Sequence, residues 1–177
     1  TRPVLIGPVT FLSLGKAKDA DLDPLSLLDD LLPVYAELLS GLADAGAAWV
    51  QLDEPILVLD MSDAQRKALK ATYGALSETG VKILIATYFG ELGDNLETVV
   101  ELPVDGLHVD LVRAAGDLDR VLRAWPWERV LSLGVIDGRN IWRADLDKAF
   151  AAIEAAIAVR GQGGLQIAPS CSLLHAQ

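Results

Sequence analysis

The sequence predicts an α/β fold in which parallel strands alternate with helices, and three observations lead to this prediction. Six short apolar runs rich in β-branched residues have the length of strands. Between them lie segments whose apolar residues recur every three or four positions, as in amphipathic helices. Polar residues follow nearly every run, which is typical of the C-terminal face of a (β/α) barrel. We therefore expect a partial (β/α)8 TIM barrel of about six parallel strands with outer helices.

An open, doubly wound sheet is the alternative arrangement of parallel strands and helices. Such a sheet usually carries a Gly-x-Gly-x-x-Gly motif after its first strand when it binds a dinucleotide, and this chain has none. The predicted strands span residues 4–6, 49–52, 81–86, 106–112, 130–136 and 165–168. Every connection is long enough to contain a crossover helix, as parallel pairing requires.

Helices are predicted over residues 25–42, 63–78, 95–102, 118–124 and 145–159. Asp23-Pro24 marks the start of the first and Gly46 its end. Pro33 lies inside this helix and should kink it or split it near Leu32. Ser62 with Gln65 three residues later predicts a capping box at the second helix, and Asp117 is the expected cap of the fourth.

The number of strands predicts an incomplete barrel. A closed barrel needs eight strands in about 250 residues, whereas six are visible in 177. The only methionine is Met61, and the chain enters its first strand almost at once. We therefore expect residues 1–177 to form one partial barrel domain that lacks the first two βα units and the last helix. Exposed sheet edges would then require the remainder of a longer chain, or a partner, for solubility.

The composition excludes several classes of function. A net charge of -10 without clusters of Lys or Arg argues against binding of nucleic acid or of an anionic membrane. A single cysteine, Cys171, excludes an internal disulfide framework, and no apolar run is long enough to span a bilayer. These features predict a soluble, cytoplasmic protein.

Two adjacent carboxylates, Asp53 and Glu54, end the second predicted strand in Trp49–Pro55. Together with Asp110 and Asp137 they would converge at the barrel mouth, where crowded negative charges raise pKa values and prepare carboxyls for proton transfer or for binding an amine. Alternatively, they are solvated strand ends, or they form a structural network with arginines. The candidate substrate-binding residues are Asp53, Glu54, Asp110, Arg139 and Asn140, and no catalytic residue is predicted.

Potential metal ligands and nucleophiles are few. A zinc site needs three or four ligands, and the chain offers only His108, His175 and Cys171 besides carboxylates. The alternative role for His108 is a buried histidine bonded to a carboxylate. Ser170 and Cys171 follow the last strand without a Gly-x-Ser-x-Gly elbow. We therefore predict no bound metal and no cofactor in this chain.

Six segments, taken together and in order, resemble the N-terminal domain of the cobalamin-independent methionine synthase family. The resemblance covers essentially the whole chain. The segments are Arg2–Leu12, Trp49–Pro55, Thr87–Phe89, Gly106–Val112, Gly138–Arg143 and Ser170–His175.

The resemblance implies a parent enzyme that transfers a methyl group from methyltetrahydrofolate polyglutamate to homocysteine. It implies two barrels face to face, with a catalytic zinc in the C-terminal barrel that lowers the pKa of the homocysteine thiol. There the zinc is held by a His-x-Cys pair, a Glu and a Cys. The related positions here are Thr87 and Phe89, Asp110, and Cys171, so that most ligand types are absent. The resemblance also places the principal folate-contacting basic residues upstream of Thr1.

The chain is thus expected to be a non-catalytic barrel segment of a methyltransferase, with the C-terminal barrel of its own polypeptide as partner. An alternative is a stand-alone binding module whose acidic mouth captures a cationic or amino-acid ligand. A third possibility is an independent enzyme with Glu54 or Asp110 as general base. It is weakened by the missing strands, because an unclosed barrel cannot preorganise its mouth.

Overall fold

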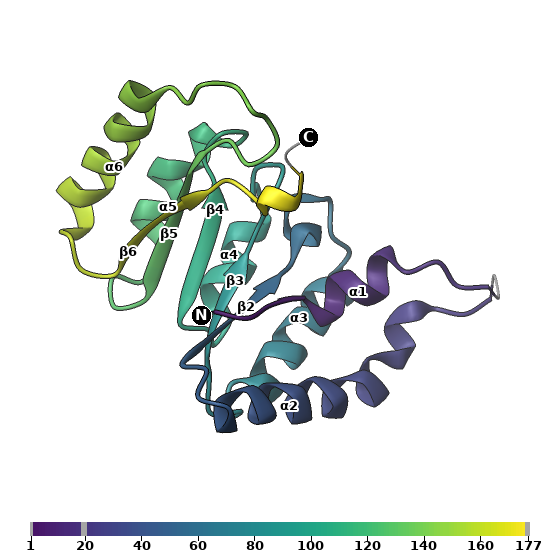
Figure 1. Cartoon of the computed structure of the whole chain (residues 1–177). Coiled ribbons are helices and arrows are strands. Elements are labelled where there is room, and N and C mark those ends of the chain that lie inside the picture. Colours follow the sequence, from purple (N-terminus) through teal and green to yellow (C-terminus); the bar gives the residue numbers. More distant parts are fainter. Residues whose placement is uncertain (1, 19–20, 176–177) are drawn as a thin grey trace.

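The structure, a computed structural model, describes residues 2–18 and 21–175. Six parallel strands form one sheet in the order of the sequence, each pairing with the next (Figure 1). They are β1 (Val4–Ile6), β2 (Trp49–Asp53), β3 (Lys82–Ala86), β4 (Gly106–Asp110), β5 (Val130–Ile136) and β6 (Leu165–Pro169). The predicted α/β fold with six parallel strands is confirmed.

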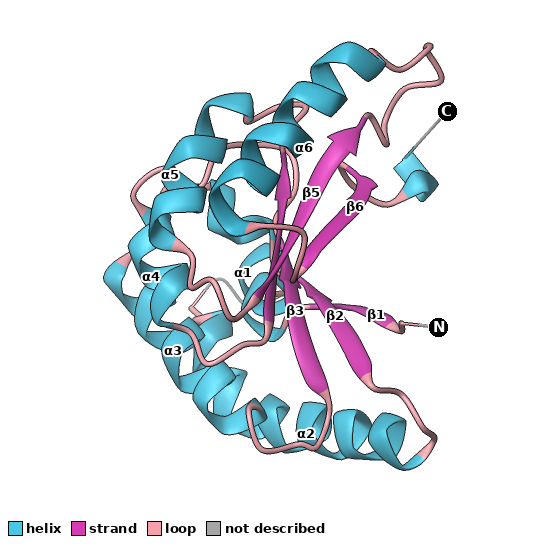
Figure 2. Ribbon diagram, turned by 90° about the vertical axis from the view of Figure 1, so that its left-hand side faces the viewer, coloured by secondary structure: helices cyan, strands magenta, loops and turns pink. Residues whose placement is uncertain are grey.

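The sheet is curved, and its α-helices lie on one side while the opposite face carries no α-helix (Figure 2). This arrangement is consistent with part of a (β/α) barrel, in which helices surround the strands. The strands at the two edges are β1 and β6. Across the concave face, Arg2 Nη1 donates a hydrogen bond of 2.9 Å to Gln166 Oε1 and so links the beginning of the sheet to its last strand.

Six helices connect or flank the strands: α1 (Pro8–Leu14), α2 (Leu28–Asp44), α3 (Asp63–Leu76), α4 (Asn95–Glu101), α5 (Leu118–Ala124) and α6 (Leu146–Arg160). Short 3-10 turns occur at η1 (Pro24–Leu27), η2 (Pro55–Val58), η3 (Ala115–Asp117) and η4 (Leu173–His175). Five of the helices occupy predicted positions. Helix α1 was not predicted, although Gly7-Pro8 is a helix-start signal because proline is favoured at the first helical position.

Pro33 was expected to kink or split its helix, and the split is wrong, because α2 is continuous from Leu28 to Asp44 with the proline inside it. The lost backbone bond would be accepted by Asp29, four residues earlier. Asp29 is exposed, so water can satisfy its carbonyl oxygen. The residues before Leu28 form the separate 3-10 turn η1. At the start of this turn, Asp23 Oδ1 accepts a hydrogen bond of 3.0 Å from the Leu25 backbone N–H.

The predicted capping box at α3 is confirmed: Ser62 accepts from the Gln65 backbone N–H, and the Gln65 side chain accepts from the Ser62 backbone N–H. The expected cap at Asp117 is wrong, since its side chain makes no capping bond to α5. Its carboxylate is used for a longer-range contact described below.

The core has two parts, one on each face of the sheet. The larger part lies between the strands and the helices and includes Leu39, Leu69 and Val121, all fully buried. A smaller cluster on the concave face contains Leu84, Ala86, Tyr88 and Cys171. Because successive strand residues point to opposite faces, the outward set packs under helices and the inward set forms the beginning of a barrel interior. Among the described residues, no helix is long and apolar enough to cross a membrane.

Candidate functional site

The carboxyl ends of the strands form one rim of the sheet, and four of the five predicted site residues lie on it. Asp53 ends β2 and Asp110 ends β4, while Arg139 and Asn140 follow β5. Glu54 is the exception. It directly follows Asp53, and adjacent residues of an extended chain point to opposite faces. We call the rim formed by Asp53, Phe89, Asp110, Asp137–Asn140 and Cys171 the mouth.

Glu54 lies on the helical side and is fully buried. Its Oε2 accepts a hydrogen bond of 2.8 Å from the Thr10 backbone N–H in α1, and its Oε1 accepts one of 2.9 Å from Tyr73 OH in α3. Burial raises the pKa of the Glu54 carboxyl despite these bonds, which lower it. Gly7 is required here, because a Cβ at this position would overlap the Glu54 side chain. Glu54 therefore ties β2 to α1 and α3, and does not join the other carboxylates.

Asp53 belongs to a compact polar group on the concave face. Gln51 Nε2 donates to Asp53 Oδ1 at 2.8 Å and to the Tyr88 hydroxyl oxygen at 2.7 Å. Tyr88 OH in turn donates to Asp53 Oδ1 at 3.0 Å. Burial, followed by the negative charge of Asp53, raises the pKa of Tyr88 well above its ordinary value of 10.0. Tyr88 is therefore a fixed neutral donor, and Asp53 is a partly exposed acceptor held in one orientation.

Asp110 is buried and organises the loops after β3 and β4. Its Oδ2 accepts from the Phe89 backbone N–H at 3.1 Å, and its Oδ1 accepts from the backbone N–H groups of Val112 and Arg113, both at 3.0 Å. Phe89 has a φ of 75°, a left-handed conformation that is uncommon for a bulky residue. The bond to Asp110 helps to hold that conformation, as backbone strain must be compensated by its surroundings.

Arg139 covers Phe89 at the outer edge of the mouth. Its guanidinium carbon lies 4.9 Å from the centre of the Phe89 ring, within the range of a cation–π contact. The turn that positions it is closed by Asp137, whose carboxylate accepts from the Arg139 backbone N–H at 2.9 Å and from Asn140 Nδ2 at 2.6 Å. These two bonds, that from Asn140 first, lower the pKa of Asp137. The expected rise in pKa from crowded carboxylates does not occur at this residue.

His108 lies below the mouth on β4 and is buried. Its Nε2 is 3.2 Å from the Ser170 carbonyl oxygen, and its Nδ1 is 2.9 Å from Ser132 Oγ. A carbonyl can only accept, so Nε2 carries the proton and Nδ1 accepts from the serine hydroxyl. Burial lowers the pKa of His108 from 6.5 to about 4. The imidazole is therefore neutral at pH 7 and bonds a serine and a carbonyl rather than the carboxylate expected from the sequence.

Cys171 is buried at the end of β6 with its sulfur and backbone against Gly138, where an added Cβ would lie 2.6 Å from the Cys171 carbonyl oxygen and 3.0 Å from its Sγ. Burial raises the pKa of the Cys171 thiol. A thiol with a raised pKa is a poor nucleophile at neutral pH. Because Gly138 packs this closely against Cys171, no larger residue fits at this position of the turn.

The residues at the four positions that the resemblance relates to zinc ligands are a poor fit for zinc. Thr87 Oγ1 donates to the His108 carbonyl oxygen at 2.9 Å, and Phe89 has no donor atom in its side chain. Asp110 already accepts three backbone bonds. Within residues 2–18 and 21–175, no group of three or more His, Cys, Asp or Glu side chains is placed to hold a metal ion. The side chain of His175 lies outside the described residues.

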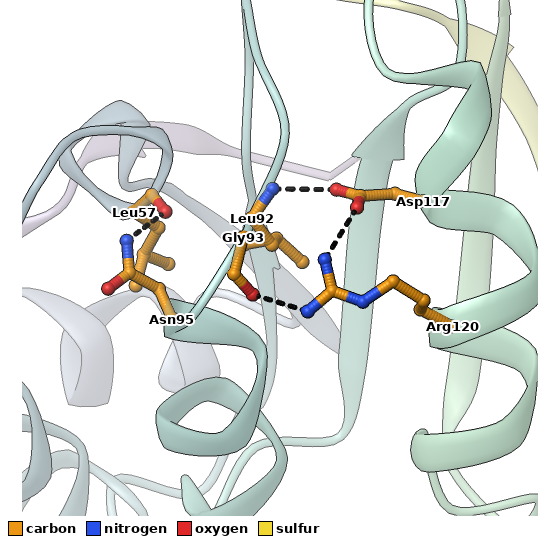
Figure 3. A network of polar contacts seen from close by, with 6 residues as sticks. All are labelled: Leu57, Leu92, Gly93, Asn95, Asp117 and Arg120. Atoms are coloured by element: carbon orange, nitrogen blue, oxygen red, sulfur yellow. Dashed lines mark hydrogen bonds and ion pairs between the residues drawn. The ribbon is translucent and has the colours of Figure 1, made fainter.

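A second polar group, which the sequence did not reveal, holds the loops on the helical side of the mouth (Figure 3). Asn95 Nδ2 donates to the carbonyl oxygens of Leu57 at 2.7 Å and Leu59 at 2.8 Å. Buried Asp117 accepts from the Leu92 backbone N–H at 2.6 Å. Arg120 contacts Asp117 at 3.5 Å and donates to the Gly93 carbonyl oxygen at 2.8 Å. The signal in the sequence was one Asn and one Asp at the starts of predicted helices. From sequence alone, such residues cannot be distinguished from ordinary helix caps.

Together these contacts describe a rigid rim. The carboxylates of Asp110 and Asp137 accept hydrogen bonds from the protein itself, and the guanidinium of Arg139 is exposed at the mouth. Such an arrangement can hold a polar ligand through Asp53, Arg139 or Asn140.

Comparison with known proteins identifies close relatives over the entire length of the chain. The family described as "Cobalamin-independent synthase, N-terminal domain" matches residues 1–160. A protein of Nitrobacter winogradskyi named 5-methyltetrahydropteroyltriglutamate–homocysteine methyltransferase is 58% identical over 177 residues, which are 99% of this chain and 23% of that protein. A protein of the same name from Salinibacter ruber is also 58% identical, with the same coverage. The chain thus spans about a quarter of the length of these relatives.

Solved structures show the same fold at low sequence identity. A putative vitamin-B12 independent methionine synthase from Listeria monocytogenes has a TM-score of 0.75 at 20% identity, covering 97% of this chain and 57% of that chain. A B12-independent methionine synthase from Shewanella has a TM-score of 0.73 at 12% identity, covering 96% and 54%. At these identities the likeness concerns the fold.

Proposed function

Because this chain belongs to the family of cobalamin-independent synthase N-terminal domains, we propose that it is a non-catalytic barrel segment of a methyltransferase that makes methionine. In this proposal the complete enzyme uses homocysteine and methyltetrahydrofolate polyglutamate, and a second, C-terminal barrel carries the catalytic zinc. The present segment forms part of the N-terminal barrel and positions the rest of the polypeptide.

The main support for the proposal is that the potential metal ligands at the mouth either bond to the protein itself or are replaced by other residues. The Asp110 carboxylate already accepts three backbone hydrogen bonds, so that only about one of its roughly four acceptor sites is left for a ligand. Thr87 and Phe89 replace the imidazole and thiolate that zinc prefers. Residues here therefore support the loops of the rim, and the zinc chemistry, which activates a thiol for attack on a methyl group, is assigned to the other barrel.

Apolar side chains at both edges of the sheet support the second part of the proposal, a structural role within a longer chain. Val4 and Ile6 on β1 are 52% and 45% exposed, and Ile167 on β6 is 62% exposed. Large apolar residues gathered at open sheet edges mark contact surfaces. Since the relatives are about four times as long, we assign these edges to contacts with the remainder of the polypeptide.

A contribution to substrate binding is proposed for Asp53, Asp110, Arg139 and Asn140, which lie on or beside the mouth. Arg139 is the exposed cation of this set and fits a carboxylate of a polyglutamate tail. Glu54 is not assigned to this set, because it is buried among α1 and α3 with both oxygens bonded. Its part in the enzyme is to hold the strand end in place.

The experiment is steady-state kinetics of the full-length protein that carries this chain, with Asp110→Asn and Arg139→Gln. We expect kcat to stay within about threefold of the unaltered enzyme, and KM for the folate to rise for Arg139→Gln. Arg123→Gln, on the exposed side of α5, is the matched control. A fall in kcat of about a hundredfold or more, the effect of losing a general acid or base, would contradict a non-catalytic role.

The alternative, a stand-alone module with an acidic mouth, is favoured by the net charge of -10 and by the partly exposed Asp53. It predicts that a cationic or amino-acid ligand binds without any other domain. Calorimetry with homocysteine, methionine and spermidine distinguishes the two proposals. A micromolar signal that disappears in Asp53→Asn would support the module, whereas the absence of heat with all three ligands supports the methyltransferase segment.

A further inference from the structure

A cavity of about 300 Å³ lies outside the sheet, apart from the concave face. Its floor is the end of β5, its sides are the segment after β4 and the first turns of α6, and the loop 137–145 forms its edge. Asp137 is the one mouth residue that also lines it. The lining residues are Leu111, Val112, Ala115, Leu118, Val135, Ile136, Asp137, Trp142, Arg143, Ala144, Asp145, Lys148, Ala149 and Ala152.

Most residues that line this cavity are apolar, and four of them are alanines. Ala115, Ala149 and Ala152 leave the space that larger residues would fill, and Val135 closes the floor. Trp142 stands at its edge with 78% of its surface exposed. An exposed indole is costly to leave in water, and tryptophan is enriched where proteins bind flat apolar groups. The cavity thus combines an apolar interior with an aromatic edge.

Of the four charged residues that line the cavity, the two carboxylates have hydrogen-bond donors in the protein and the two cations have no acceptor among the described residues. Asp137 accepts two hydrogen bonds in its own turn, and Asp145 accepts a hydrogen bond of 3.1 Å from the Lys148 backbone N–H at the start of α6. Within the described part of the chain, the side chains of Arg143 and Lys148 form no hydrogen bond or ion pair, and both are exposed. Two available cations therefore face the same apolar space in a protein whose net charge is -10.

We propose that this cavity is a binding site for a small organic anion with a flat apolar body, such as an aromatic carboxylate or sulfonate. The aromatic body packs between Trp142 and the alanine wall, and the anionic group bonds Arg143 and Lys148. An apolar pocket with a few converging polar groups is the usual form of a small-molecule site. An anionic ligand is favoured over a cationic one because Asp137 and Asp145 already accept hydrogen bonds from the protein, whereas the side chains of Arg143 and Lys148 donate none to the described part of the chain.

The test is a fluorescence titration of the full-length protein with two probes of the same shape. Anilinonaphthalene sulfonate carries the anionic group, and N-phenylnaphthylamine lacks it. We expect the sulfonate to bind more tightly than the neutral probe. The double variant Arg143→Gln/Lys148→Gln should weaken sulfonate binding by about tenfold, since each of the two exposed contacts contributes up to about fivefold, and should leave the neutral probe unchanged. Arg123→Gln, outside the cavity, is the charge control.

A second variant tests the location. Ala115→Phe fills the cavity from an exposed position, so that the core is not disturbed, and should abolish binding of both probes. Ala151→Phe on the exposed side of α6 is its matched control. The proposal is overturned if Ala115→Phe leaves sulfonate binding unchanged, or if removal of both cations weakens the two probes equally. Circular dichroism of each variant identifies any that has lost its fold.

Discussion

Acidification should destabilise the protein through His108, which the fold holds in its neutral form. The folded-state pKa is about 4, against 6.5 for the free side chain. Above pH 6.5 the imidazole is neutral in both the folded and the unfolded state. As the pH falls from 6.5 to about 4, the unfolded chain binds a proton that the folded chain excludes, and the free energy of unfolding decreases. At roughly 1.4 kcal/mol per pKa unit, the difference between the folded and unfolded pKa values corresponds to about 3 kcal/mol of unfolding free energy.

The surroundings of His108 explain why its pKa is lowered in the folded protein. Burial is the largest cause, and nearby Arg2 also lowers the pKa, whereas Asp110 and the bond to the Ser170 carbonyl raise it. Protonation would moreover place a second proton on Nδ1, which now accepts from Ser132 Oγ at 2.9 Å. The serine hydroxyl can rotate to accept that proton, but the charge would remain desolvated.

The assay is the pH titration of the imidazole by NMR, with the resonance assigned by its absence in His108→Asn. We expect a midpoint near pH 4, and between pH 7 and pH 4 a loss in the free energy of unfolding by urea that is about 3 kcal/mol greater than in the variant. A midpoint near 6.5 would refute the reasoning, since it would require an imidazole in contact with water. The NMR measurement uses the unaltered protein and so does not depend on the stability of the variant.

Two further predictions concern packing. Tyr73→Phe removes the 2.9 Å hydrogen bond to buried Glu54 and should lower the free energy of unfolding by about 1–3 kcal/mol; an unchanged urea midpoint would contradict the described contact. Gly134→Ala would place a Cβ 2.7 Å from the Val109 carbonyl oxygen and should cost more than about 1 kcal/mol. Gly74→Ala, in α3 with nothing within 4 Å, should instead stabilise by up to about 1 kcal/mol, so equal effects of the two changes would count against the assigned packing.

Strand positions followed from the sequence because buried parallel strands are short apolar runs, and this signal is local. The capping box of Ser62 and Gln65 was predictable for the same reason. Helix α1 was missed because its seven residues are mostly apolar and contain no full amphipathic repeat. Phe89 could not have been foreseen, because its left-handed conformation depends on Asp110 from the next strand.

The candidate site was predictable only in part. Asp53 and Glu54 are adjacent, and the two-residue period of a strand implies that they cannot both face the interior. That argument was available from the sequence, but which of the two is buried depends on Thr10 and Tyr73, which are distant in sequence. The cavity at Trp142 brings together three separate segments and so had no local signal.

Zinc analysis of the full-length protein with Cys171→Ser tests the central claim most directly, because Cys171 is the one thiol of this chain. The claim that this barrel segment is non-catalytic predicts the same zinc content per chain and the same kcat as the unaltered protein. Loss of zinc from the variant, together with loss of methyl transfer while the fold is retained, would contradict it.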